Sequence, residues 1–599
     1  MDPLLSRRRT LQAIAASLAL PCLPGLAFAA GPETASQRLR RLIAESEAAS
    51  NALDPLPRTP PPRGTAVFVD PLGEQAFAAG RTNAMRDLAG LASIDRPELP
   101  PTDQIAFDVL QYNAEQRVES YQAGMAQLKQ RVPLDPSGGL HVELPDYVSG
   151  AGAPFATADD YEIGLERLHG FAGYLDTLAR RAREGLKLGF VQPRVVAEKV
   201  AAQAEAMLAV PSADSPFLAA TRKFPESLTA EQRSRFTARY VRAVDAEVLP
   251  AYRRLATFLR QDYVPKATDS PGRWAMKDGI ALYANELRYH TTVDVTAEQL
   301  HATGLAEVAR IRSSMEATRA QVGFKGDLPA FFEFIRKDPR FYYTRPDDLL
   351  ARFAQIEQRI WAGMPRLFAR KPEAPFEVRA LPAIGGQRGT GYYRPGPPDG
   401  KSPGVLWFNM AMLNTRPIPT LETLTLHEGI PGHHYQITLA LEDDTLPDNL
   451  RYGSPTAYAE GWGLYSESLG PELGLFTDPY QWFGHLDMEM LRAVRLVVDT
   501  GMHAQRWTRR RAIDYMLANT SMAQHDVEVE IDRYIAWPGQ ACAYKTGELR
   551  IKALRDEAAN RLGGRFDVKD FHEQVLNTGG LPLAVLERKV RSWCCAAAA

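Results

Sequence analysis

The chain has 599 residues, of which 70 are basic and 72 acidic, so its formal net charge at pH 7 is −2. This balance argues against a nucleic-acid partner, because such proteins carry an excess of lysine and arginine. With 45% hydrophobic residues and only four cysteines, the composition predicts a sizeable core and excludes a disulfide scaffold.

The first 29 residues have the features of an export signal. The sequence Ser-Arg-Arg-Arg-Thr-Leu at residues 6–11 fits the twin-arginine pattern, and Ala-Phe-Ala at 27–29 offers a cleavage site. The alternative is a membrane anchor, but the apolar run at 14–20 is too short to span, and no later run is long enough. We therefore expect the twin-arginine translocation machinery as a partner, and a mature protein that is periplasmic or secreted.

Helical patterns dominate the rest of the chain. The predicted helices cover residues 37–53, 103–131, 158–186, 194–208, 230–260 and 297–322. The last of these opens with Thr296 and Gln299, which have the spacing of a capping box. A turn-rich segment at 268–273 suggests two lobes, an N-terminal helical lobe at 30–270 and a catalytic lobe at 271–599.

Strand patterns are few. Residues 376–381 alternate with period two, residues 404–409 are rich in β-forming side chains, and a turn-rich connection joins them. Tyr393, in that connection, is a candidate substrate contact. Asn409 ends the second strand, where it could face a substrate cleft or cap a turn.

Residues 421–436 read L-E-T-L-T-L-H-E-G-I-P-G-H-H-Y-Q and hold three of the eleven histidines. In the zinc-binding H-E-x-x-H helix, two histidines four positions apart bind the metal and the glutamate acts on its water. Here that position is Pro431, which cannot continue the helix, so we expect a bend or widening just after Ile430. The alternative is a helix end with surface histidines, which is how we interpret His572 and its neighbour Glu573.

Two histidines compete to pair with His427. On an ideal helix His433 is rotated by about 120° from His427, and His434 lies roughly 10 Å further along the axis. A loop-out of two residues would bring His433 into place, whereas His434 needs three. We therefore predict His433 as the metal ligand and His434 as a substrate contact, with the reverse assignment left open.

The segment H-E-G-I-P-G-H-H-Y-Q resembles the signature His-Glu-x-x-Pro-Gly-His-x-x-Gln of a large bacterial family of unknown function, numbered 885. The resemblance extends over most of the mature chain and is densest at about residues 278–550. That family is grouped with the gluzincin metallopeptidases, whose third zinc ligand is a glutamate on a later helix. The resemblance places this ligand at Glu460, 33 residues after His427. Glu467 could instead be the ligand, or it could support a residue that binds the metal. The simpler alternative is that both glutamates lie on a solvated helix face and bind no metal.

Two later segments carry further candidates. Arg492, Arg495, Asp499 and His503 form one polar stripe on an apolar helix. The stripe is either an internal salt-bridge ladder or a means for Arg495 or His503 to reach the cleft and bind a substrate carboxylate or a developing oxyanion. The family resemblance favours the second. Residues 538–539, Pro-Gly, should end one helix and let Gln540 start another.

Tyr544, in the helix that begins at Gln540, is the candidate hydrogen-bond donor to a tetrahedral oxyanion, since gluzincins often use a tyrosine in this way. A buried tyrosine that ties two helices together is the alternative.

These observations predict a mainly α, zincin-like, two-lobed helical protein with a small β-sheet next to the metal-binding helix. One Zn²⁺ would be held by His427, His433 and Glu460, with Glu428 as the base that activates its water. The expected function is zinc-dependent cleavage of peptide bonds, with a peptide or small amide as substrate and no membrane attachment after signal removal. The alternatives are an amidase or lactam hydrolase on the same site, or a non-enzymatic binding protein with a structural metal.

Overall fold

The computed structural model describes residues 33–57, 67–381 and 391–598, so the predicted signal at 1–29 lies outside the described residues. Helices account for 71% of the structure and strands for 3%, which confirms the predicted mainly helical fold. Among the described helices, none has both the length and the apolar character needed to cross a bilayer.

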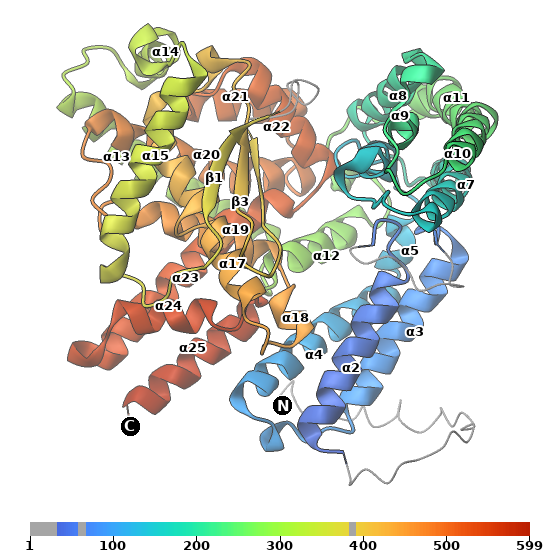
Figure 1. Cartoon of the computed structure of the whole chain (residues 1–599). Helices are drawn as coiled ribbons and strands as arrows, with labels where there is room; N and C mark the ends of the chain where they lie inside the picture. The colour runs from blue at the N-terminus through green and yellow to red at the C-terminus, as the bar shows by residue number, and fades with distance from the viewer. Residues whose placement is uncertain (1–32, 58–66, 382–390, 599) are drawn as a thin grey trace. The chain divides into compact units, whose positions relative to one another are not determined.

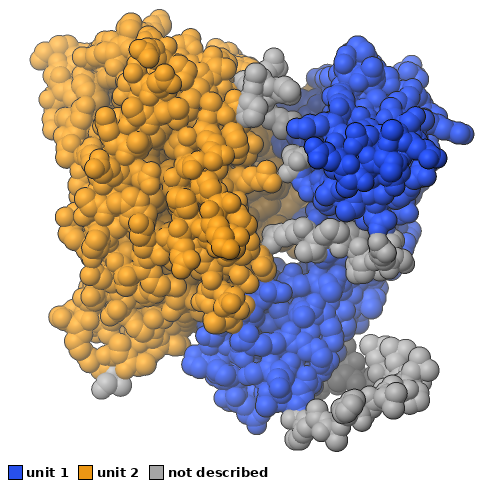
Figure 2. All heavy atoms as spheres, viewed as in Figure 1, with its two compact units in different colours: residues 1–190, 197–266, 447–449 blue, residues 191–196, 267–446, 450–599 orange. Residues whose placement is uncertain are grey.

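The chain divides into two compact units (Figure 2). Unit 1 comprises residues 1–190, 197–266 and 447–449, and unit 2 comprises 191–196, 267–446 and 450–599. The main division after residue 266 lies close to the boundary at 270 that the turn-rich segment suggested.

In its described residues, the regular secondary structure of unit 1 is all helical (Figure 1). Its helices are α2 (Ala35–Asn51), α3 (Glu74–Leu91), α4 (Pro101–Gln122), α5 (Met125–Lys129), α6 (Leu140–Asp146), α7 (Ala158–Leu188), α8 (Arg194–Ala209), α9 (Ala219–Arg222), α10 (Ala230–Ala243) and α11 (Leu249–Phe258). The helices α2, α3 and α4 pack on one another, and α10 and α11 pack on α7. Two predicted helices are divided: residues 103–131 at Gly124, whose φ is 75°, and residues 230–260 at a π turn, η5 (Val244–Val248), just before Pro250.

Unit 2 contains the remaining helices and the sheet. The helices are α12 (Gly279–Thr291), α13 (Ala297–Gln321), α14 (Leu328–Lys337), α15 (Pro346–Gly363), α16 (Leu421–Leu424), α17 (His433–Glu442), α18 (Asp448–Arg451), α19 (Thr456–Ser468), α20 (Pro479–His503), α21 (Arg509–Asn519), α22 (Gln524–Ala536), α23 (Gln540–Leu562), α24 (Val568–Leu576) and α25 (Leu583–Ala598). The predicted capping box is present, since the Thr296 side chain accepts from Gln299 N–H and the Gln299 side chain accepts from Thr296 N–H. The predicted restart at Gln540 is also confirmed.

The sheet has three strands in the order β1-β3-β2. The two predicted strands are β1 (Phe376–Ala380) and β3 (Gly404–Phe408), which pair in parallel. The connection between them was predicted to be turns, but it contains β2 (Gly391–Arg394), which pairs antiparallel with β3. Because β3 is central and largely buried, β1 and β2 form the two edges of the sheet.

The core of unit 2 is built around α20, which packs against α13, α21 and α23. Close helix crossings use glycine: a Cβ on Gly461 of α19 would lie 2.4 Å from Gly547 Cα of α23. This contact holds α19, which carries the predicted glutamate ligand, directly against α23, which carries Tyr544.

The histidine that the sequence placed on the surface is buried. His572 is fully inaccessible, its Nε2 lies 2.8 Å from the Tyr465 hydroxyl, and its Nδ1 lies 2.8 Å from the Leu367 carbonyl. The prediction was wrong because these partners are far from His572 in sequence, and a local pattern does not reveal them.

Candidate metal centre

The histidine-rich segment is not a bent continuous helix. α16 runs into a widened π turn, η14 (Thr425–Gly429), and the chain then becomes extended at Ile430 and forms a cis peptide bond to Pro431. A new helix, α17, begins at His433. A Cβ on Gly432 would lie 1.9 Å from the His427 carbonyl oxygen, so only glycine allows the chain to fold back this closely. The widening was predicted, but the second histidine is positioned by a break between two helices.

This break brings three donors together. Glu460 Oε2 lies 3.5 Å from Nε2 of His427 and 3.5 Å from Nε2 of His433. These separations exceed the usual hydrogen-bond length of about 2.7–3.2 Å. They are close to the spacing of about 3.4 Å between neighbouring ligands of a tetrahedral zinc ion with bonds near 2.1 Å. The donor set therefore fits the metal that the sequence predicted.

His427 is held from two sides. Its Nδ1 lies 2.8 Å from Glu467 Oε1, and this contact orients the ring so that Nε2 is directed toward Glu460. A Cβ on Gly463 would lie 2.7 Å from the imidazole, so α19 fits around the ring only because this residue is glycine. Burial alone would lower the pKa of His427, but Glu460 and Glu467 raise it to about 9. Of the two roles that the sequence left open for Glu467, the structure shows a support for a ligand.

His433 is supported by the side-chain amide of Gln436, which lies 2.9 Å from its Nδ1. The same amide nitrogen donates to the Ala459 carbonyl at 3.0 Å, so Gln436 also ties α17 to α19. Burial raises the pKa of Glu460, but His427 and His433 outweigh this effect and hold it well below the usual value. The carboxylate is therefore ionised and available as a ligand.

His434 points elsewhere. Its Nδ1 lies 3.0 Å from the Tyr393 hydroxyl of β2, and its ring packs on Phe376 of β1. Burial lowers the pKa of His434 to about 4, so the ring is neutral. Between the two histidines, the structure thus places His433 beside His427 and uses His434 to join α17 to the sheet. Tyr393, predicted as a substrate contact, is the partner in that junction.

Glu428 follows His427 directly and is half-buried. Burial is the main cause of the raised pKa of Tyr393, and the negative charge of Glu428 adds to it. Glu428 is thus adjacent in the chain to the His427 donor, and its role as a base stays a prediction.

Tyr544 lies on α23, which packs against α19, the helix that carries Glu460. Burial raises the pKa of its phenol, and the nearby charge of Glu460 raises it further. The phenol is therefore protonated at neutral pH and can donate a hydrogen bond to a developing oxyanion. The guanidinium carbon of Arg495 lies 4.4 Å from the centre of the Tyr544 ring.

The polar stripe on α20 is not an internal ladder, because each member bonds to another element. Arg495 donates from Nε to the Tyr534 hydroxyl at 2.8 Å and from Nη2 to Glu530 at 2.9 Å, both on α22. Asp499 accepts from the backbone N–H of Gly539 at the start of α23. Glu530 was missed in the sequence, although its spacing of four residues from Tyr534 on one helix face was a usable signal.

Two predicted site residues have structural partners instead. His503 Nδ1 accepts from the Arg273 N–H at 3.2 Å and its Nε2 donates to the Tyr534 carbonyl at 3.0 Å, so neither nitrogen is left for a catalytic role. Asn409 Oδ1 accepts from the Ala411 N–H at 3.1 Å, which is the turn cap that the sequence left open as an alternative.

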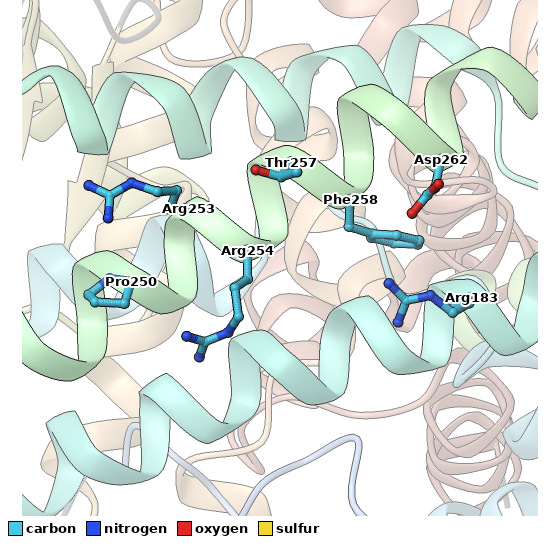
Figure 3. Close-up of a pocket in the computed structure, with 7 residues that line it drawn as sticks. All are labelled: Arg183, Pro250, Arg253, Arg254, Thr257, Phe258 and Asp262. Atoms are coloured by element: carbon cyan, nitrogen blue, oxygen red, sulfur yellow. The ribbon is translucent and has the colours of Figure 1, made fainter.

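A surface hollow of about 560 Å³ lies on unit 1 between α7 and α11 (Figure 3). Arginines dominate its lining, and Arg183 stacks on Phe258 at 4.2 Å. The lining offers one carboxylate, Asp262, and no histidine, so this hollow lacks the donors of a metal site.

The sequence profile of a bacterial protein family of unknown function, DUF885, matches residues 66–590. Among curated proteins, the comparison finds no match. A solved "putative lipoprotein" from Colwellia psychrerythraea is 28% identical with a TM-score of 0.82, and the match covers 94% of this chain and 100% of that chain. A "putative lipoprotein of unknown function" from Shewanella oneidensis is 16% identical with a TM-score of 0.69, and the match covers 93% of this chain and 99% of that chain. At this identity the likeness is one of fold alone.

Proposed function

This chain belongs to the bacterial family of unknown function DUF885, and we propose that it is an exported, zincin-like, zinc-dependent hydrolase of peptide or other amide bonds. The observation that carries the proposal is the convergence of two imidazole nitrogens on one carboxylate oxygen at 3.5 Å each. Nitrogen and carboxylate donors of this kind suit zinc, although they do not exclude other divalent transition metals.

The openness of the centre favours a catalytic over a structural metal. Closed structural sites have four protein ligands, whereas the described residues supply three donors here. The side chains of His433 and Glu460 are 14% and 20% exposed, while that of His427 is 4% exposed. Solvent therefore reaches one side of the donor set, where a substrate carbonyl could also approach.

Each nearby side chain has a defined task in this mechanism. A zinc ion bound by His427, His433 and Glu460 would supply Lewis-acid chemistry, lowering the pKa of water and polarising the scissile carbonyl. Glu428 accepts the proton of the attacking water and returns it to the leaving amine. Tyr544 donates its phenolic hydrogen to the carbonyl oxygen as negative charge develops there.

Export is proposed from the twin-arginine pattern at Arg7 and Arg8. Twin-arginine export carries folded proteins, so the zinc would be loaded before translocation. The two related structures are described as lipoproteins, which agrees with a location outside the cytoplasm.

The decisive experiment measures zinc content and amide hydrolysis together. The purified mature protein should contain about one zinc per chain and should digest a peptide library, and chelation should abolish the digestion. Glu428→Gln should retain the zinc but lose about 10²–10⁴-fold in kcat, because it removes the base and no ligand. A protein that binds no transition metal, or a variant with unchanged kcat, would contradict the mechanism.

A further inference from the structure

The guanidinium of Arg495 has one donor without an acceptor. The side chain is 8% exposed, and its Nε and Nη2 are bonded to Tyr534 and Glu530. Nη1 is buried and has no hydrogen-bond partner among the residues that the structure describes. Leaving a charged donor unpaired away from water is unfavourable, so a ligand acceptor at this position would remove a cost that the free protein carries.

The surroundings of Arg495 also carry an excess of positive charge. In the part of the chain that the structure describes, the salt bridges of both Arg495 and Arg533 go to the same carboxylate, Glu530. The further donor Nη1 of Arg533 is bonded to the neutral amide of Gln540. Two cations therefore share one anion, and a second anion would complete the cluster.

This cluster lies beside the candidate metal centre. Tyr544 lies on α23, which packs against α19, the helix that carries Glu460, and the Tyr544 ring is 4.4 Å from the guanidinium of Arg495. One peptide residue spans about 3.3–3.6 Å along the chain. An anion that reached Arg495 would thus be about one residue beyond a carbonyl held at Tyr544.

We infer that Arg495 binds the free C-terminal carboxylate of a peptide, which makes the enzyme an exopeptidase that releases single residues from that end. The inference rests on the proposed hydrolase function and specifies its substrate class. A C-terminal carboxylate occurs in every peptide with a free end and lies one residue from the last peptide bond, as the geometry requires. Arginine is suited to this task because its planar fork binds carboxylates through two parallel hydrogen bonds.

A structural role for Arg495 would give a different result. If Nη1 serves only to stack on the Tyr544 ring, the guanidinium positions the tyrosine and does not recognise a ligand. The protein would then bind and cleave peptides with the same efficiency whether or not the C-terminus carries a charge.

The test uses two peptides that differ only in a free or amidated C-terminus, and a third that is amidated but has glutamate as its last residue. Binding to the zinc-free full chain is measured by calorimetry, and the products of the zinc-loaded chain are identified by mass spectrometry. The free acid should bind about 10–100-fold more tightly than either amide, and single C-terminal residues should appear as products. Equal binding of acid and amide, preference for the glutamate side chain, or internal cleavage would each overturn the inference.

Variants separate recognition from structure. Arg495→Gln should abolish the preference for the free acid, while Glu530 keeps its salt bridge to Arg533. Arg495→Lys keeps the charge without the fork and should retain part of the preference. Arg509→Gln is the matched control, because that arginine pairs with Asp532 of the same helix α22 and should leave the preference unchanged.

If Arg495→Gln weakens the binding of all three peptides equally, Arg495 has a structural role. The same conclusion follows if the variant fails to fold and the wild type binds the free acid and the amides equally. The calorimetric preference does not depend on zinc or on turnover. A protein without zinc or hydrolysis that still prefers the free acid would refute the proposed function and leave the carboxylate site standing.

Discussion

Gly463→Ala should weaken zinc binding without unfolding the protein. A Cβ at this position would lie 2.7, 2.9 and 3.1 Å from three atoms of the His427 imidazole. To restore contacts of about 3.4 Å, the ring must move by about 0.7 Å. The ring has little freedom to do so, since its side chain is 4% exposed and its Nδ1 is held by Glu467 at 2.8 Å.

The size of this movement determines the outcome. Metal–ligand distances tolerate deviations of only about 0.2 Å, so we expect zinc affinity to fall by at least about 10–100-fold. The cost to the fold is smaller: overpacking destabilises by about 1–3 kcal/mol, and alanine in a helix recovers about 1 kcal/mol relative to glycine. Chelator competition would measure zinc affinity, and thermal unfolding of the zinc-free protein would measure stability.

A matched control is available in unit 1. Gly173 also lies within a helix, α7, but a Cβ there would meet nothing within 4 Å. Gly173→Ala should therefore leave zinc affinity unchanged and slightly raise stability. If Gly463→Ala binds zinc as tightly as the wild type, the proposed contact between α19 and the His427 ring does not govern the metal site.

Three further predictions test other parts of the argument. Glu467→Gln should weaken zinc binding by about 10–100-fold, measured by chelator competition, because it removes the negative charge that supports His427; unchanged affinity would contradict that role. Burial raises the pKa of Asp499 to about 7 in the folded protein, whereas an aspartate in the unfolded chain has a pKa of about 3.9. Between about pH 4 and 7 the folded protein therefore keeps a proton on Asp499 that the unfolded chain has lost. Stability should therefore fall by up to about 4 kcal/mol as pH rises from about 4 to 7, and Asp499→Asn should flatten this slope in urea unfolding measured at several pH values; parallel slopes would refute the assignment. Replacing Arg7 and Arg8 with lysine should leave precursor in the cytoplasm, detected by cell fractionation, whereas normal export would indicate the general secretory route.

Local sequence was sufficient where short-range chemistry determines the structure. The capping box at Thr296, the two strands and the helix start at Gln540 follow from residues within a few positions of one another. The placement of His433 beside His427 belongs to the same class, because Pro431 and Gly432 determine where one helix ends and the next begins.

Sequence reasoning was insufficient where partners are distant in the chain. The burial of His572 depends on Tyr465 and Leu367, more than a hundred residues earlier. Strand β2 was not predicted because it is short and mostly exposed, so it has no pattern of hydrophobic residues of its own. It is defined by its pairing with β3. The hydrogen bonds of His503 to Arg273 and Tyr534 likewise could not be predicted from the spacing of polar residues along α20 alone.

The distribution of charge connects the proposed function with the inferred specificity. Glu428, Glu460 and Glu467 concentrate negative charge on the side of the centre that would hold a cation, whereas Arg495 and Arg533 leave an excess positive charge beyond Tyr544. A peptide whose last carbonyl lies at Tyr544 has its terminal carboxylate on the positive side of this field. The reversed peptide would bring its terminal ammonium group toward the two guanidinium groups and would be repelled. The same electrostatic asymmetry that would favour a metal ion would thus also orient the proposed substrate, with the C-terminal residue as the leaving group.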